Sequence, residues 1–172
     1  MLGLTTSGDS HFPKVTVTLA LILCFAMLAA CAAPPAAPSA SEPVYEIVAQ
    51  DVAYSGGSDQ PIMLAVTGTD ALAGAPAGLP PDVVAALQAA AAENPDALYI
   101  VIYAGMKPGG GYAVSVDSMA LEGTEGSQTL VVTYSESAPE GAGTAALTYP
   151  YVIARVLSPP VSPDNVRFAA GS

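Results

Sequence analysis

The sequence predicts a small α+β domain in which a mostly antiparallel β-sheet carries one main helix. Residues 81–94, PDVVAALQAAAAEN, show the one clear helical periodicity of the chain. Residues 97–104, ALYIVIYA, are apolar on both faces, which is typical of a central strand that is covered on both sides. Most of the chain after this strand alternates with the two-residue period of strands. We find no internal repeat, so the pattern indicates a single domain.

Two strands and a loop are predicted before the helix. Residues 44–54, VYEIVAQDVAY, alternate enough to form a strand and lead into the turn signal SGGSD. Residues 61–68, PIMLAVTG, are a second apolar run. Residues 69–81 are rich in Gly, Ala and Pro, and this composition predicts a loop with one short helical turn.

The helix has a clear beginning, a buried face and an end. Pro81 suits the first turn, where its missing N–H costs nothing, and Pro95 ends the helix because a proline disfavours the helical conformation of the preceding residue. One face at helical spacing is expected to pack on the sheet. It consists of Val83, Val84, Leu87, Ala90 and Ala91.

Three further strands are predicted after the central one. They occupy residues 112–119, 128–136 and 151–157, and each is bounded by turn residues. Residues 158–165, SPPVSPDN, break regular structure. The strand at 151–157 is therefore predicted to be the last.

The first 30 residues have the features of a secretory signal. Lys14 precedes an apolar stretch at residues 15–30, and small residues come before a cysteine. LAAC, at residues 28–31, resembles the lipobox of bacterial lipoproteins. The resemblance implies that Cys31 receives a diacylglycerol thioether, that the signal is cut before it and that its new amine is acylated. The alternative is an uncleaved membrane anchor, although the stretch is shorter than the roughly 20 residues that span a bilayer.

The predicted organisation has four parts: a signal at 1–30, a lipidated cysteine with a Pro, Ala and Ser tether at 31–43, the domain at 44–168 and a tail at 169–172. The tether composition cannot bury a core and is expected to stay extended. Several acyl chains are enough for stable attachment. We therefore expect the domain to lie on the extracytoplasmic side of the cell membrane or the outer membrane.

The charge of the chain is strongly acidic. Four Lys and Arg residues stand against fifteen Asp and Glu residues, which gives a net charge of −11. After Cys31 the only basic residues are Lys107, Arg155 and Arg167. Such a surface repels phosphates, so nucleic acid is excluded as a partner. It also repels anionic lipid headgroups, so the acyl chains alone must hold the protein at the membrane.

Residues 104–114, AGMKPGGGYAV, raise the question of a phosphate-binding loop. A P-loop has its lysine after the glycines and runs into a helix. Here Lys107 precedes the glycines, and they run into a strand pattern. The segment is therefore predicted to be a hairpin connection, in which Gly109, Gly110 and Gly111 allow positive φ. No cofactor is expected.

The same segment resembles the Gly-Tyr hairpin of the PrcB C-terminal domain family, which is named for a lipoprotein subunit of a bacterial surface protease complex. The matching residues are Pro108, Gly110, Gly111 and Tyr112. Gly109 stands where the family has threonine. A Pro-Tyr pair that opens the last strand of the family is matched within LTYPYVIARV by Tyr149, Pro150 and Tyr151. The resemblance covers roughly residues 44–158, and it implies an accessory, non-catalytic envelope protein.

These motif residues have two interpretations. In the structural one, which we favour, the tyrosines fill the core and Pro150 shapes the start of a strand. In the functional one, tyrosines form a contact patch for a peptide or a partner strand. That patch would contain Tyr99, Tyr103, Tyr112, Tyr149 and Tyr151. A secreted protease is the kind of protein partner to which the family name points.

Missing residue types argue against an enzyme. The only histidine is His11, in the predicted signal, and the mature chain has no free cysteine and no tryptophan. Ser-His-Asp and Cys-His arrangements are therefore excluded, as are zinc sites that need His or Cys. The alternative function is a carboxylate-dependent extracytoplasmic hydrolase that acts on glycans. Its candidate carboxylates are Asp117, Glu122, Glu125, Glu136 and Glu140. We expect a membrane-anchored lipoprotein that acts as a non-catalytic binding or accessory subunit.

Overall fold

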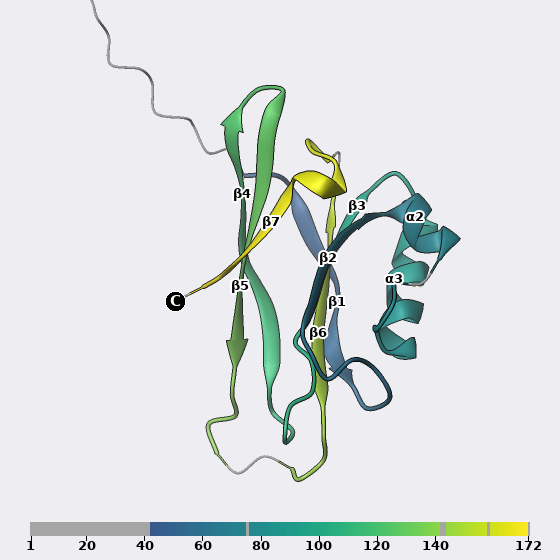
Figure 1. Cartoon of the computed structure of the whole chain (residues 1–172), viewed down its shortest axis with the longest axis vertical. Coiled ribbons are helices and arrows are strands. Elements are labelled where there is room, and N and C mark those ends of the chain that lie inside the picture. The colour runs from purple at the N-terminus through teal and green to yellow at the C-terminus, as the bar shows by residue number, and fades with distance from the viewer. Residues whose placement is uncertain (1–41, 75, 142–143, 158, 172) are drawn as a thin grey trace, which may run out of the picture. The chain divides into compact units, whose positions relative to one another are not determined.

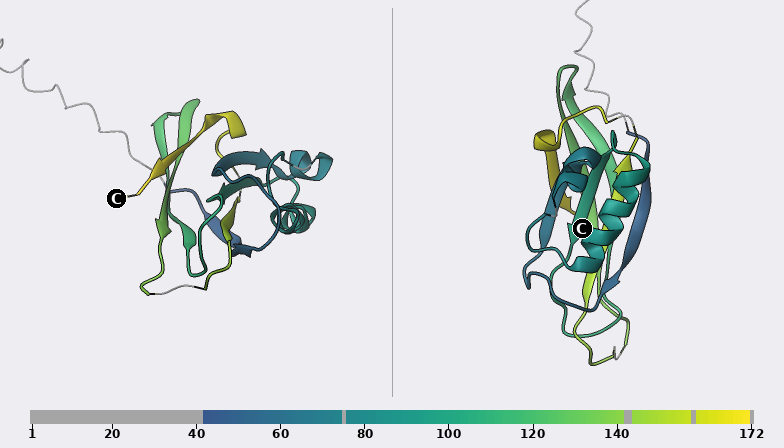
Figure 2. Two further views of the ribbon diagram at one scale, coloured as in Figure 1. Left: turned by 60° about the horizontal axis from the view of Figure 1, so that its bottom comes forward. Right: turned by 90° about the vertical axis from the view of Figure 1, so that its right-hand side faces the viewer.

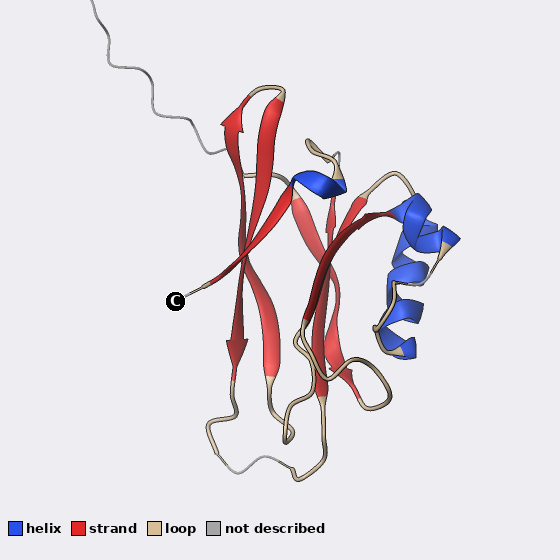
Figure 3. Cartoon of the chain, in the orientation of Figure 1, coloured by secondary structure: helices blue, strands red, loops and turns tan. Residues whose placement is uncertain are grey.

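The computed structural model describes residues 42–171 apart from residues 75, 142, 143 and 158, and these residues form three layers (Figure 1). Two helices are one outer layer, a four-stranded sheet is the middle layer and a three-stranded sheet is the other outer layer. The helices cover only one face of the middle sheet (Figure 3), and α3 (Pro81–Glu93) lies along that face (Figure 2). The predicted signal, Cys31 and residues 31–41 of the tether lie outside the described residues.

The middle sheet has the strand order β1-β6-β3-β2, and all neighbouring strands are antiparallel. Its strands are β1 (Tyr45–Ala53), β2 (Ile62–Thr67), β3 (Leu98–Tyr103) and β6 (Tyr149–Val156). Every residue of β3 is buried, as its apolar sequence predicts for a central strand. β1 and β2 are the edges.

The second sheet is built on a long antiparallel hairpin. Its strands are β4 (Ala113–Thr124), β5 (Ser127–Ser137) and β7 (Val166–Ala170), in the order β4-β5-β7. β7 pairs with β5 in parallel and follows a short 3-10 helix, η1 (Pro163–Asn165). The prediction that the last strand ends near residue 157 is therefore wrong. β7 is only five residues long and pairs with a strand that lies about 35 residues earlier, so local sequence gives it little signal.

The main helix has the predicted bounds within one residue, and the loop before it contains a short helix that begins one residue earlier than the predicted loop. The short helical turn in the loop is α2 (Gly68–Ala73), whose first turn is capped by the Thr67 hydroxyl accepting from the backbone N–H of Asp70 at 3.1 Å. Pro81 stands in the first turn of α3. The predicted face of α3 is confirmed: four of its five residues are buried and Val84 is partly buried against them.

The middle sheet separates two apolar cores. One lies between this sheet and the helices, and the other lies between the two sheets. Alternate residues of β3 pack into one core and then the other, because neighbouring side chains of a strand point to opposite faces. Tyr99, Val101 and Tyr103 face the helices, whereas Leu98, Ile100 and Ile102 face the second sheet.

The predicted α+β class with one main helix is confirmed, and the strands divide between two sheets. The hairpin prediction for the glycine segment is wrong, because β3 and β4 belong to different sheets. Residues 104–112 instead carry the chain from the middle sheet to the second sheet. A two-residue period identifies strands but does not say which strands pair, and this is why the connection was misassigned.

Candidate interaction site at the loop end of the domain

The two motif segments lie side by side at one end of the middle sheet. The Lys107 N–H donates to the Thr148 carbonyl at 2.8 Å, and the Thr148 N–H donates to the Lys107 carbonyl at 3.2 Å. Ala104 N–H donates to the Pro150 carbonyl at 2.9 Å. We call this end the loop end. It comprises residues 54–61, 104–112, 138–141 and 144–148.

Thr148 fastens the glycine segment to the start of β6. Its side chain is buried, with 2% of its surface exposed, and its hydroxyl donates to the Gly109 carbonyl at 2.6 Å. A buried hydroxyl is stable only when it is hydrogen-bonded. The sequence analysis missed this residue. A lone polar residue directly before an apolar strand was the available signal.

The three consecutive positions 109–111 require glycine for different structural reasons. Gly111 has φ of +87°, which disfavours any residue with a Cβ, and a Cβ there would also lie 2.8 Å from the Pro139 side chain. Gly110 donates from its N–H to the Thr144 carbonyl at 2.9 Å, and a Cβ at this position would overlap the Thr144 hydroxyl. The prediction of positive φ is thus confirmed for Gly111, whereas Gly109 and Gly110 allow two loops to approach closely.

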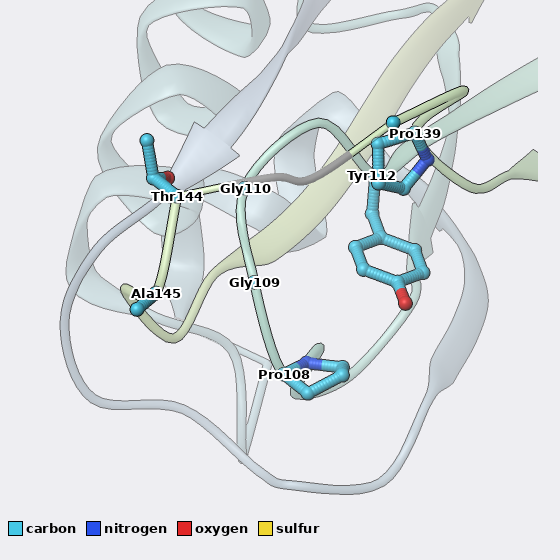
Figure 4. Close-up of a pocket in the computed structure, with 8 residues that line it drawn as sticks. Pro108, Gly109, Gly110, Tyr112, Pro139, Thr144 and Ala145 are labelled. Atoms are coloured by element: carbon cyan, nitrogen blue, oxygen red, sulfur yellow. The ribbon is translucent and has the colours of Figure 1, made fainter.

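An open pocket of about 250 Å³ lies between these loops (Figure 4). The Gly109–Gly110 backbone runs between Thr144 on one side and Tyr112 with Pro139 on the other. Few side chains stand in this pocket, so its wall is largely backbone and proline ring. Such a wall offers peptide groups, an apolar ring surface and the hydroxyls of Tyr112 and Thr144, and its described lining residues include no carboxylate or imidazole.

The five tyrosines do not form the predicted surface patch. Tyr99 and Tyr103 are fully buried, and Tyr151 has 7% of its surface exposed. Tyr103 stacks on Tyr149 with ring centroids 6.2 Å apart, and its hydroxyl donates to the Ser58 carbonyl at 2.7 Å. Tyr112 and Tyr149 are half-buried. The favoured structural interpretation therefore holds for the three buried rings.

Burial raises the pKa of three of these tyrosines, Tyr99, Tyr103 and Tyr151. Burial, together with the nearby Tyr149 and Asp59, raises the pKa of Tyr103 to about 12. Burial, together with the charges of Asp51 and Asp82, raises the pKa of Tyr151. The three hydroxyls stay protonated at physiological pH, so they act as packed, neutral groups and not as bases.

All three basic residues of the described part are held by glutamates. Lys107 Nζ lies 2.5 Å from Glu136 Oε2, and Arg167 Nη2 lies 2.9 Å from Glu122 Oε2. Arg155 binds Glu46 and lies 3.5 Å from Glu93. Lys107 is therefore engaged with a carboxylate, and β4 rather than a helix follows the glycines. Both facts argue against a phosphate loop.

Glu122 and Glu136, the two candidate catalytic carboxylates that form ion pairs, lie far apart. Glu122 is opposite Thr129 and Glu136 is opposite Val114, at the two ends of the β4–β5 hairpin, so about 26 Å of strand separates them. Asp117 accepts from the Ser135 hydroxyl at 2.8 Å, on the face opposite that of Glu136. A glycosidase pair needs a separation of roughly 5–10 Å. Among the described residues no group of three or more His, Cys, Asp or Glu could hold a metal ion.

The comparison with protein families identifies the segment that contains both motifs. Residues 98–156 match the family described as PrcB C-terminal. The predicted resemblance is confirmed over this segment, which runs from β3 to the end of β6. No curated protein and no solved structure matches the chain significantly. None of the described helices has the length and apolar character needed to cross a membrane.

We expect Gly111→Ala to destabilise the domain more than Gly126→Ala. Both glycines have nearly equal φ, +87° and +85°, but nothing lies within 4 Å of a Cβ at Gly126. The backbone strain of about 1–2 kcal/mol is common to both variants, and only Gly111→Ala also pushes against Pro139. Thermal unfolding of the two variants measures the difference. Equal melting temperatures would show that the loops do not pack as described.

The raised pKa of Tyr103 predicts a loss of stability in alkali. Below pH 10 tyrosine is neutral in both states. Between pH 10 and about 12 the unfolded tyrosine ionises while the folded one does not, so the free energy of unfolding falls by about 1.4 kcal/mol per pH unit. Tyr103→Phe should reduce this slope, and Tyr54→Phe, at an exposed position, should not. Denaturant unfolding across this pH range measures both slopes, and identical slopes in wild type and Tyr103→Phe would contradict the burial of this hydroxyl.

Proposed function

We propose that the protein is an envelope lipoprotein, anchored through Cys31, that acts as a non-catalytic accessory or binding subunit. The observation that carries this proposal is the family match over residues 98–156, which contains both motif segments. The family is named for a lipoprotein subunit of a surface protease complex, so a secreted protease is a fitting partner. The lipobox-like LAAC sequence and the Pro-rich segment after it support the anchor.

The chemistry of the loop end supports binding over catalysis. Its pocket is lined by glycine backbone, proline rings and one tyrosine, and its lysine is already paired with Glu136. Three of the five candidate carboxylates, Asp117, Glu122 and Glu136, are engaged at separate places on the β4–β5 hairpin. A surface of this kind recognises a polypeptide through backbone groups and apolar contacts.

The course of β1 sets the orientation of the domain in this proposal. Residue 42 is followed closely by Tyr45, which is opposite Val156, whereas Ala53 at the other end of β1 is opposite Tyr149. Nine residues of strand, about 26 Å from first to last, separate the two ends. The Pro-rich segment therefore joins the domain at the end of β1 that is opposite the loop end.

The proposal predicts that Cys31 is required for lipid labelling and that the wild-type chain captures a protein partner. In cells that express the tagged full chain, a palmitate analogue should label the wild type and leave Cys31→Ser unlabelled, because only the thiol can form the thioether. A protein partner should co-purify with the wild type in near-stoichiometric amount. Equal labelling of both chains would contradict the anchor. Glycan turnover by the purified chain that is lost on Glu136→Gln would contradict the non-catalytic role.

A further inference from the structure

Three large apolar side chains stand exposed at the loop end. Tyr54, Met106 and Leu147 expose 73%, 40% and 52% of their surfaces. Tyr54 follows the last residue of β1, and Leu147 lies just before β6, so both adjoin the strand pair that ends at this edge. Met106 precedes the residue that bridges to Thr148. Exposed apolar side chains gathered at one end mark a contact surface.

Four carboxylates lie in or beside the loop end. The Met106 N–H donates to the Asp59 carbonyl at 3.2 Å, which places Asp59 beside Met106. Asp51 pairs with Tyr151 in the β1–β6 register, and Asp82 lies close enough to Tyr151 to influence its ionisation. Glu140 follows Pro139, which lines the pocket. The four acids are exposed.

No basic side chain among the described residues offsets this charge. Lys107 is the basic residue at the loop end, and its ammonium is paired with Glu136. Arg155 and Arg167 are paired with Glu46 and Glu122. The loop end thus presents exposed apolar side chains and, in or beside it, four exposed carboxylates, next to a pocket with a backbone wall.

We propose that the loop end binds a basic polypeptide segment that also carries apolar side chains, contributed by an extracytoplasmic partner protein. The inference rests on the accessory function proposed above and specifies the chemistry of the partner. Lysine or arginine side chains of the segment meet the carboxylates, and its apolar side chains cover Tyr54, Met106 and Leu147. Complementary charge of this kind accelerates association and selects among partners.

Other occupants fit the surface less well. A second copy of this chain also carries a net charge of −11 and would be repelled by these four carboxylates. An anionic membrane would be repelled for the same reason. A second group of exposed apolar residues, Val44, Ile47 and Leu157, lies at the opposite end of β1, where residues 42–44 lead into the sheet. In the proposed lipoprotein that is the end to which the tether is covalently joined.

Defined peptides test the proposal on the full chain in neutral detergent. The probes are three fluorescent twelve-residue peptides that alternate Lys with Leu, Glu with Leu, and Lys with Ser. We expect the Lys-Leu peptide to bind at least tenfold more tightly than the other two peptides. The binding of the Lys-Leu peptide should be weaker in 0.5 M salt. The NMR signals of labelled methionine methyl groups locate the binding site. The Met106 signal should shift when the peptide binds, and the signal of Met119, which is buried between the sheets, should not.

Matched variants separate this surface from general attraction to an acidic protein. Leu147→Ser should lower the affinity for the Lys-Leu peptide at least fivefold. Leu72 lies on α2 and is similarly exposed at 45%, and Leu72→Ser should leave this affinity unchanged. The pair Asp51→Asn and Asp59→Asn should weaken binding more than Glu125→Gln with Asp164→Asn. The second pair removes the same charge from the β4–β5 turn and from η1, neither of which belongs to the loop end.

Three outcomes would overturn the inference. One is equal affinity for the Lys-Leu and Lys-Ser peptides, which would mean that charge alone attracts them. Another is an affinity for the Lys-Leu peptide that is the same in Leu147→Ser and in the wild type. The third is a dimer of the chain that Leu147→Ser dissociates, which would make a second copy the occupant. The accessory function itself would stand if a partner still co-purified with Leu147→Ser, so the two proposals can fail separately.

Discussion

The pairing of β3 with β6 is the constraint on which the other parts of the structure depend. Both strands are buried on both faces, so each must satisfy its backbone within the sheet and its side chains in two cores at once. The helices pack on one set of alternate residues and the second sheet packs on the other. Loss of this pair would remove the surface on which both outer layers rest.

The candidate site is a direct extension of the same two strands. β3 leads into the glycine segment, and β6 begins directly after Thr148, whose hydroxyl holds the Gly109 carbonyl. Below the loops, the stacked rings of Tyr103 and Tyr149 close the helix-side core. The loops are therefore positioned by the most deeply buried part of the domain, which gives a rigid base to a surface that is itself built of loops.

The sequence predicts those features that local pattern encodes. The apolar run at residues 98–103 predicts a covered strand, and the spacing from Val83 to Ala91 predicts a helix with one buried face. Pairing between distant segments left no such local mark. The parallel partner of β7 and the division into two sheets therefore escaped prediction. The glycines themselves do not show why glycine is needed at each position. A close approach to Thr144 and a positive φ both require the absence of a Cβ, so the sequence cannot distinguish the two.

Native-state hydrogen exchange of the full chain tests the central role of the β3–β6 pair most directly. If this pair supports both layers, the amides of Ile100, Val101 and Ile153 exchange only through global unfolding, and their opening free energies equal the unfolding free energy. The amides of β7, a short edge strand, exchange through smaller openings. Slower exchange in the β4–β5 hairpin than in β3 and β6 would contradict this account, because the second sheet would then be stable without the strands on which it packs.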